Sequence, residues 1–216
     1  MNSVTVIGVT KTQGADAIIA SVELGILNIG ESYVQEALQK IDAVSNNETC
    51  KKVIWHFIGR LQTNKIKMLD KRFSFVHSVY KSDQLKELDK RITIELGVFF
   101  EMNTGGEESK GGASSVDEIK VLLDQLLEIN SKRIASGKPE LMPMGLMCIP
   151  PFSDDPEASR NYFASLRDNL EKINFACGTK MKGLSMGMSS DFDIAIEEGA
   201  THVRIGTLLY GERGKV

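Results

Sequence analysis

The chain has 216 residues, of which 42% are hydrophobic and 25% are charged, the proportions of an ordinary soluble globular protein. Its formal net charge of -3 gives no electrostatic reason to expect nucleic acid as a partner. The length is enough to bury a substantial core and falls in the range of single α/β barrels, so we expect one domain over residues 1–216.

The first predicted element is an apolar, β-branched strand over residues 4–11 that stops on Lys11. An ammonium group is not expected at the C-terminal end of a buried strand unless it serves a purpose there or is exposed to water. Lys11 is therefore either a candidate for the chemistry or simply the point where the strand meets water. An amphipathic helix over residues 15–24 follows, and Gly25 ends it.

Strands and helices continue to alternate along the chain. Strands are predicted over residues 4–11, 26–29, 53–58, 75–79, 96–103, 141–149, 182–186 and 201–205. Helices are predicted over residues 15–24, 33–44, 64–69, 84–89, 116–130, 154–173 and 191–198. We expect Ser82 to cap the fourth helix and Ser114 and Ser115 to cap the fifth. Polar connections are expected over residues 46–52, 104–112 and 131–139, the second being a candidate lid.

This alternation predicts parallel strands joined by right-handed helical crossovers, in an open doubly wound sheet or a closed barrel. Eight units in about 200 residues favour a single TIM-type (β/α)8 barrel. Reactive groups of such barrels lie at the C-terminal ends of the strands, and Lys11 stands at one of these ends.

The loops after the last two strands carry small residues and glycines just before helical segments. Ser185, Met186 and Gly187 belong to the first of these loops, and Gly206 and Thr207 to the second. Free backbone N–H groups and short hydroxyl side chains are what a phosphate needs, and barrel enzymes often bind phosphate after strands seven and eight. The alternative is that the glycines only permit tight turns.

If phosphate binds there, Lys11 and Arg204 lie close by, because the first and eighth strands are neighbours in a closed barrel. A lysine amine near other cations and partly desolvated can attack a carbonyl to form a Schiff base. Pyridoxal 5'-phosphate (PLP) is the obvious phosphorylated aldehyde. Arg204 would then face the pyridine nitrogen and weaken the ring as an electron sink, which suits racemisation or simple carriage.

The motifs that carry a family resemblance are residues 9–12, 30–36, 55–65, 145–147, 184–189 and 203–207. Their order and spacing closely resemble those of the pyridoxal phosphate homeostasis proteins, a family that looks like the N-terminal barrel of alanine racemase standing alone. The resemblance implies that Lys11 is the Schiff-base lysine, holding PLP as an aldimine. It also implies that Ser185, Gly206 and Thr207 form the phosphate shell and that Arg204 lies at the pyridine nitrogen. The family usually has Asn where this chain has Ser32, another residue we place at the cofactor.

Two further residues are candidates for the cofactor site. His56 is either a proton carrier near the cofactor or a hydrogen-bonded core residue, the commoner role of a histidine in an apolar strand. Asn64 either lines the mouth of the site or caps the helix that it precedes. His77, His202 and Trp55 are expected to be structural.

Three functions are open at this point. The first is a PLP carrier in vitamin B6 homeostasis, with no catalytic residues assigned. The second is an amino-acid racemase, which needs an acid/base on each face of the cofactor, and the sequence places none of the four tyrosines there. The third is a barrel that binds another phosphorylated metabolite non-covalently. We expect the carrier, a non-enzyme, with amino acids and PLP-dependent enzymes as candidate partners.

The cysteines Cys50, Cys148 and Cys177 are odd in number and lack Cys-x-x-Cys spacing. We therefore expect free thiols in a reducing compartment and no metal site. No apolar run reaches the ~18 residues of a membrane span, and no charged leader precedes the first strand. These features predict a cytoplasmic protein without a membrane partner, and we expect it to be a monomer.

Overall fold

A computed structural model describes residues 3–107 and 110–211 of the chain. Eight parallel strands follow one another in chain order, and the barrel closes where β8 pairs with β1. The strands are β1 (Thr5–Val9), β2 (Asn28–Glu31), β3 (Ile54–Phe57), β4 (Phe73–Val79), β5 (Leu96–Glu101), β6 (Leu141–Met147), β7 (Gly183–Met188) and β8 (His202–Ile205). The prediction of a (β/α)8 barrel is confirmed.

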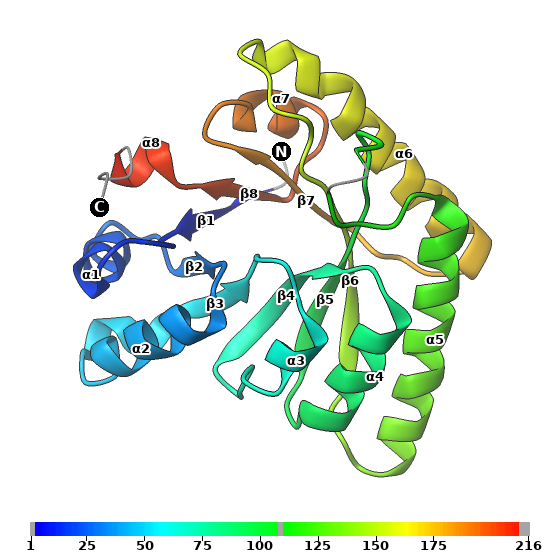
Figure 1. Ribbon diagram of the computed structural model, residues 1–216, viewed down its shortest axis with the longest axis horizontal. Coiled ribbons are helices and arrows are strands. Elements are labelled where there is room, and N and C mark those ends of the chain that lie inside the picture. The colour runs from blue at the N-terminus through cyan, green and yellow to red at the C-terminus, as the bar shows by residue number, and fades with distance from the viewer. Residues whose placement is uncertain (1–2, 108–109, 212–216) are drawn as a thin grey trace.

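The helices surround the strands in chain order, so that α8 returns beside α1 (Figure 1). The α-helices are α1 (Ala15–Glu23), α2 (Val34–Val44), α3 (Thr63–Ile66), α4 (Ser82–Arg91), α5 (Val116–Ala135), α6 (Arg160–Cys177), α7 (Phe192–Glu197) and α8 (Thr207–Tyr210). Two 3-10 helices, η1 (Glu48–Lys52) and η2 (Pro156–Ser159), precede β3 and α6. None of the helices in the described ranges is long and apolar enough to span a membrane.

The main hydrophobic core lies between the outer face of the barrel and the helices. On α1, for example, Ile18 and Val22 recur at helical spacing and pack against the strand residue Ile29. The side chains of Ile7 and Arg204 belong to paired positions of β1 and β8. Because side chains alternate along a strand, Val9 continues the face of Ile7 toward the barrel mouth.

The structure corrects several local predictions. Ser82 is the first residue of α4 rather than its cap, and its hydroxyl donates to Gln125, while the side chain of Gln84 accepts from the backbone N–H groups that precede the helix. The polar segment 46–52 contains η1, which buries Cys50. Ser115 does cap α5, by accepting from the Glu118 N–H.

Helix α5 also runs further than predicted, to Ala135, into the segment expected to be a solvated connection. The reason is Arg133, which is 1% exposed and donates to the carbonyls of Pro139, Asp89 and Ile92. A guanidinium group can cap several buried carbonyls at once because it presents five N–H donors. Within the loop over residues 104–112, residues 108 and 109 lie outside the described part of the chain.

Candidate functional site

A cavity of about 680 Å³ opens at the C-terminal ends of the strands. Its lining residues come mainly from the loops after β1, β6, β7 and β8. They are Val9, Lys11, Ser32, Ile58, Ile149, Phe152, Met188, Ser189, Ser190, Arg204, Gly206, Thr207 and Leu208. The cavity therefore joins an amine, a guanidinium group and a cluster of hydroxyl groups on a largely apolar wall.

Lys11 reaches this cavity from the turn that follows β1. The Gln13 N–H donates to the Thr10 carbonyl over 2.9 Å and closes the turn. Thr10 is fully buried, whereas Lys11 is only partly buried. The chain thus leaves the core at Lys11, with its side chain on the cavity wall.

Arg204 forms the floor of the cavity and is 5% exposed. Its Nη1 donates to the Ser185 hydroxyl over 2.8 Å, and its Nη2 donates to the Cys148 carbonyl over 2.9 Å. Burial lowers the pKa of Arg204, an effect opposed by the neighbouring Cys148, Asp191 and Glu101. The two hydrogen bonds fix the orientation of the guanidinium group.

A buried chain of hydrogen bonds continues from Arg204 into the barrel interior. Ser185 bonds to His77 Nδ1 over 2.8 Å, His77 Nε2 bonds to His56 Nδ1 over 3.0 Å, and His56 Nε2 bonds to Asn28 Oδ1 over 3.0 Å. Burial lowers the pKa of His56 to about 3 and that of His77 well below its usual value, so both rings are neutral at pH 7. Because Asn28 Oδ1 can only accept and each neutral ring carries a single N–H, His56 donates to Asn28, His77 donates to His56, and the Ser185 hydroxyl donates to His77.

Ser189 organises the other side of the cavity. Its hydroxyl oxygen accepts from the Gly206 N–H over 3.2 Å and from the Leu208 N–H over 3.3 Å. Two backbone N–H groups therefore converge on one oxygen, and Thr207, the residue between Gly206 and Leu208, also lines the cavity. An anionic oxygen needs donors arranged in this way.

The loop that carries Ser189 is held in place by Asp191. Asp191 is 5% exposed, and its carboxylate accepts from the Met188 N–H over 2.7 Å and from the Ser159 hydroxyl over 2.8 Å. This carboxylate ties the end of β7 to η2. The loop is therefore anchored by buried polar contacts before any ligand binds.

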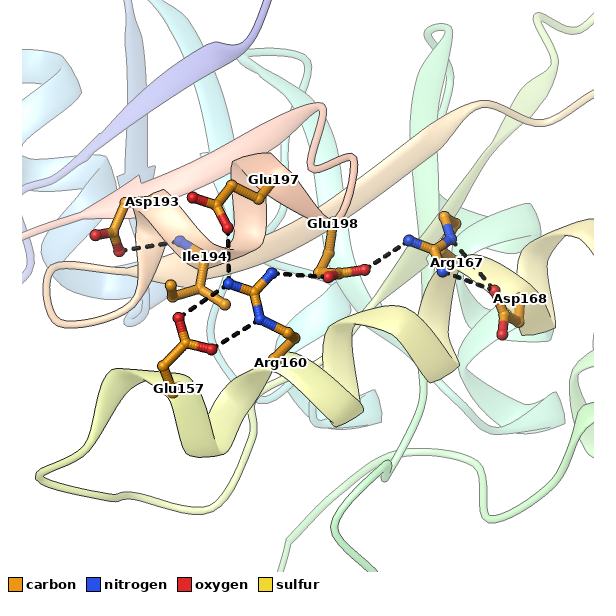
Figure 2. A network of polar contacts seen from close by, with 8 residues as sticks. All are labelled: Glu157, Arg160, Arg167, Asp168, Asp193, Ile194, Glu197 and Glu198. Atoms are coloured by element: carbon orange, nitrogen blue, oxygen red, sulfur yellow. Dashed lines mark hydrogen bonds and ion pairs between the residues drawn. The ribbon is translucent and has the colours of Figure 1, made fainter.

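An ionic network on the surface connects η2, α6 and α7. Figure 2 shows Arg160 of α6 between Glu157 of η2 and the end of α7. Arg160 contacts Glu197 over 2.7 Å and Glu198 over 2.9 Å, and Arg167 contacts Glu198 over 2.6 Å. Exposed ion pairs of this kind contribute little individually to stability. They link η2 and α6 to the C-terminal end of α7, the helix that follows the Ser189 loop.

Five of the residues predicted for the cofactor site line the cavity. They are Lys11, Ser32, Arg204, Gly206 and Thr207. Ser185 does not line the cavity itself, but its hydroxyl accepts a hydrogen bond from Arg204, which does.

The other four predicted residues lie elsewhere. Met186 belongs to the outer hydrophobic core, and Gly187 faces α7, where an added Cβ would come within 2.5 Å of the Ala195 Cβ. His56 is buried deep in the barrel as a hydrogen-bonded core residue. Asn64 is exposed as the second residue of α3, so it does not cap that helix.

Sequence reasoning missed two residues of chemical interest. Ser189 closes one of the family motifs, but the sequence alone predicts no role for it, because only the fold places two N–H groups against its hydroxyl. Glu101 ends β5, and burial raises the pKa of its carboxyl group to about 7, with Arg204 and Arg60 acting in the opposite direction. The sequence signal for Glu101 is the same as that for Lys11, a charged residue that closes an apolar strand at the barrel mouth.

The chain is similar to proteins of known name over nearly all of its length. The family model of the alanine racemase N-terminal domain matches residues 1–214. The pyridoxal phosphate homeostasis protein of Aquifex aeolicus is 40% identical over 215 residues, which cover 98% of this chain and 88% of that protein. The human pyridoxal phosphate homeostasis protein is 36% identical over 219 residues, which cover 96% of this chain and 76% of the human one.

Two solved structures extend the comparison. The structure of PipY from Synechococcus elongatus with PLP bound matches with a TM-score of 0.81 at 27% identity, covering 96% of this chain and 92% of PipY. Alanine racemase from Corynebacterium glutamicum matches with a TM-score of 0.68 at 15% identity, covering 97% of this chain and 56% of the racemase. The second likeness concerns the fold alone.

Proposed function

Because the chain belongs to the alanine racemase N-terminal domain family and, within it, to the pyridoxal phosphate homeostasis proteins, we propose that it binds PLP covalently through Lys11 and serves PLP homeostasis. One observation carries the assignment to this site. Lys11, the buried Arg204 and the Ser189 loop line the same cavity at the barrel mouth. The relative PipY, at 27% identity, is described with PLP bound, which supports the choice of ligand.

The donors of the cavity fit a phosphorylated pyridine aldehyde. Ser189, Thr207 and the Gly206 N–H would hold the phosphate, and Arg204 would face the ring nitrogen. When bound, the cofactor supplies an aldehyde carbon that condenses with a primary amine to form a C=N bond and water. Lys11 is the residue that offers this amine at the cavity wall.

We infer that catalysis is weak or absent. Arg204 is held by Ser185 and the Cys148 carbonyl, so a fixed cation would disfavour protonation of the ring nitrogen and limit electron withdrawal. Racemisation also needs an acid/base on each face of the cofactor. Among the described residues that line the cavity, the ionisable side chains are Lys11 and Arg204. The hydroxyl of Tyr210 is hydrogen-bonded to that of Ser21 on α1.

An absorbance titration tests covalent binding. Wild-type protein mixed with PLP should develop a band near ~420 nm, and Lys11→Arg should lack it because a guanidinium group cannot form the bond. Lys65→Ala removes another lysine on the same side of the barrel and should keep the band. A wild-type protein that stays colourless with added PLP favours the alternative, a barrel that binds another phosphorylated metabolite.

A turnover assay separates the carrier from a racemase. The PLP-loaded protein is incubated with L-alanine, and D-alanine is followed by chiral chromatography. The carrier proposal predicts no turnover above the rate of free PLP. Formation of D-alanine at about 1 per second or faster, an ordinary enzyme rate, would overturn it.

The wider setting is also a proposal. Three cysteines without disulfide bonds support a reducing compartment, so we propose a cytoplasmic location. We further propose a monomer that exchanges PLP with amino acids and PLP-dependent enzymes. Light scattering of the loaded protein tests the monomer. A PLP-free acceptor enzyme is added and the two proteins are then separated; loss of the ~420 nm band from this protein, together with recovery of the acceptor enzyme's activity, tests the transfer.

A further inference from the structure

The turn that carries Lys11 has a strained backbone. Thr12, the residue after Lys11, has a φ angle of +65°, and it is the only non-glycine residue with positive φ in the described part of the chain. Turns with a positive φ at this position favour glycine or asparagine, and a β-branched threonine fits there poorly. Such strain persists only where the surroundings hold the backbone in place, and it is frequent at functional sites.

A buried cluster of charges holds this turn from outside the barrel. We call Thr10, Glu31, Glu36 and Lys40 the Lys40 cluster. Lys40 Nζ donates to the Thr10 carbonyl over 2.6 Å, and it forms ion pairs with Glu31 over 2.8 Å and Glu36 over 2.6 Å. The Thr10 hydroxyl donates to Glu31 over 2.5 Å, and the Thr12 N–H donates to Glu36 over 2.6 Å.

The cluster therefore hydrogen-bonds to the backbone of both neighbours of Lys11, namely Thr10 and Thr12. Thr10 and Glu31 are fully buried, and Lys40 is 7% exposed. Lys40 lies on α2, so the cluster ties this helix to the ends of β1 and β2. Lys11 lines the cavity, whereas the side chain of the neighbouring Thr10 hydrogen-bonds to Glu31 within the cluster.

Stability alone does not account for such a cluster. Burying the Glu31 carboxylate and the Lys40 ammonium group carries a large desolvation cost, which the mutual attraction of a buried ion pair often only balances. Glu31 Oε2 is buried without a hydrogen-bond partner among the described residues, and burial raises the pKa of Glu31 in spite of Lys40 and Thr10. Apolar residues in place of both Glu31 and Lys40 would pack between β2 and α2 at lower cost if nothing else were required there.

We propose that Lys40 is a positioning residue for Lys11: together with Glu31 and Glu36 it holds the strained turn from Thr10 to Gln13, so that the Lys11 amine stands at the cavity wall. The inference rests on the proposed function, since it concerns how Lys11 meets an aldehyde. The covalent step itself needs no further reactant. The Lys11 amine forms a C=N bond to the aldehyde carbon, and its two protons leave with the aldehyde oxygen as water.

The test separates covalent attachment from simple retention of PLP. Wild-type and Lys40→Met proteins are equilibrated with PLP, and total bound PLP is measured by ultrafiltration. The attached fraction is then trapped by borohydride, which reduces the C=N bond to a stable amine, and the Lys11 peptide is quantified by mass spectrometry. In Lys40→Met we expect PLP to be retained by the phosphate loop, with the equilibrium between attached and unattached PLP lowered about five-fold or more.

Matched variants separate positioning from loss of folding. Lys40→Arg keeps a cation at the cluster and should restore most of the attachment. Adding Thr12→Gly to Lys40→Met should also restore it, because glycine adopts positive φ without strain. Arg133→Met removes a different buried cation, at the opposite end of the barrel from the cavity, and should lower stability without changing the attached fraction.

Each outcome decides between the possibilities. Equal attachment in wild type and Lys40→Met refutes the positioning role. Absence of attachment in wild type refutes the proposed function instead. If Lys40→Met does not fold, Glu36→Gln replaces it as the deciding variant. Glu36 is partly exposed, so this variant should fold, and it weakens the hydrogen bond that Glu36 accepts from the Thr12 N–H. Reduced attachment of PLP in Glu36→Gln supports the proposal, and unchanged attachment overturns it.

Discussion

Replacing Glu101 should change how the stability of the cofactor-free protein depends on pH. Burial raises the pKa of this carboxyl group from 4.5 to about 7, although Arg204 and Arg60 act in the opposite direction. Between these two values the folded protein therefore holds a proton that the unfolded chain has released. The free energy of unfolding contributed by Glu101 is accordingly highest below pH 4.5 and falls as the pH rises through 7.

The magnitude follows from the shift. A pKa change from 4.5 to about 7 corresponds to at most about 3 kcal/mol, because each unit is worth 1.36 kcal/mol and the side chain is only partly buried. Glu101→Gln removes the ionisable group and keeps the shape. The difference in unfolding free energy, variant minus wild type, should therefore rise by up to about 3 kcal/mol from pH 4 to pH 8.

Urea denaturation followed by circular dichroism, at one-unit intervals from pH 4 to pH 8, gives this difference. His56 and His202, whose pKa values burial lowers to about 3 and about 4, make the wild-type curve slope the other way, but they contribute equally to both proteins and cancel. Glu87→Gln is the control. A hydrogen bond from Arg91 lowers the pKa of the partly exposed Glu87, so the difference for Glu87→Gln should be small and of opposite sign. A flat difference for Glu101→Gln would refute the reasoning.

Two further variants test the packing and the phosphate loop. Gly187→Ala should lower the free energy of unfolding by about 1–3 kcal/mol in urea denaturation, because the φ angle of Gly187 is +90° and the new Cβ would lie 2.5 Å from that of Ala195. Gly14→Ala is the control and should have little effect, because a Cβ at Gly14 meets nothing within 4 Å. Ser189→Ala should weaken PLP binding about ten-fold in a fluorescence titration, with only a small loss of thermal stability because the hydrogen bonds that it removes lie near the surface. An unchanged affinity would remove Ser189 from the phosphate site.

The barrel could be predicted well from the sequence because its signals are local and repeated. Apolar runs and helical spacings mark each element, and the crossover rules then leave little choice of topology. Caps were less predictable. Ser115 caps α5 as expected, but Gln84 takes the capping role expected of Ser82, because a longer side chain reaches back to the N–H groups ahead of the helix. The end of α5 depends on Arg133 and on carbonyls up to 44 positions away, which no local pattern encodes.

The candidate site was predictable where strand order alone decides it. Lys11 and Arg204 come together because β1 pairs with β8. The phosphate residues were harder to assign, because Ser185 and Ser189 are only four positions apart. Ser185 lies within β7 and supports Arg204, whereas Ser189 lies in the loop after β7 and lines the cavity. The Lys40 cluster could not be predicted because its members come from the turn after β1, from β2 and from α2, and because its three charged residues look like ordinary surface charges in the sequence.

The most direct measurement of the central claim is a crystal structure of the protein with PLP. We predict continuous density between Lys11 Nζ and the aldehyde carbon, with the phosphate at Ser189, Gly206 and Thr207 and the ring nitrogen facing Arg204. Density for PLP outside this cavity, or a bound PLP with a separate Lys11 side chain, would contradict the claim.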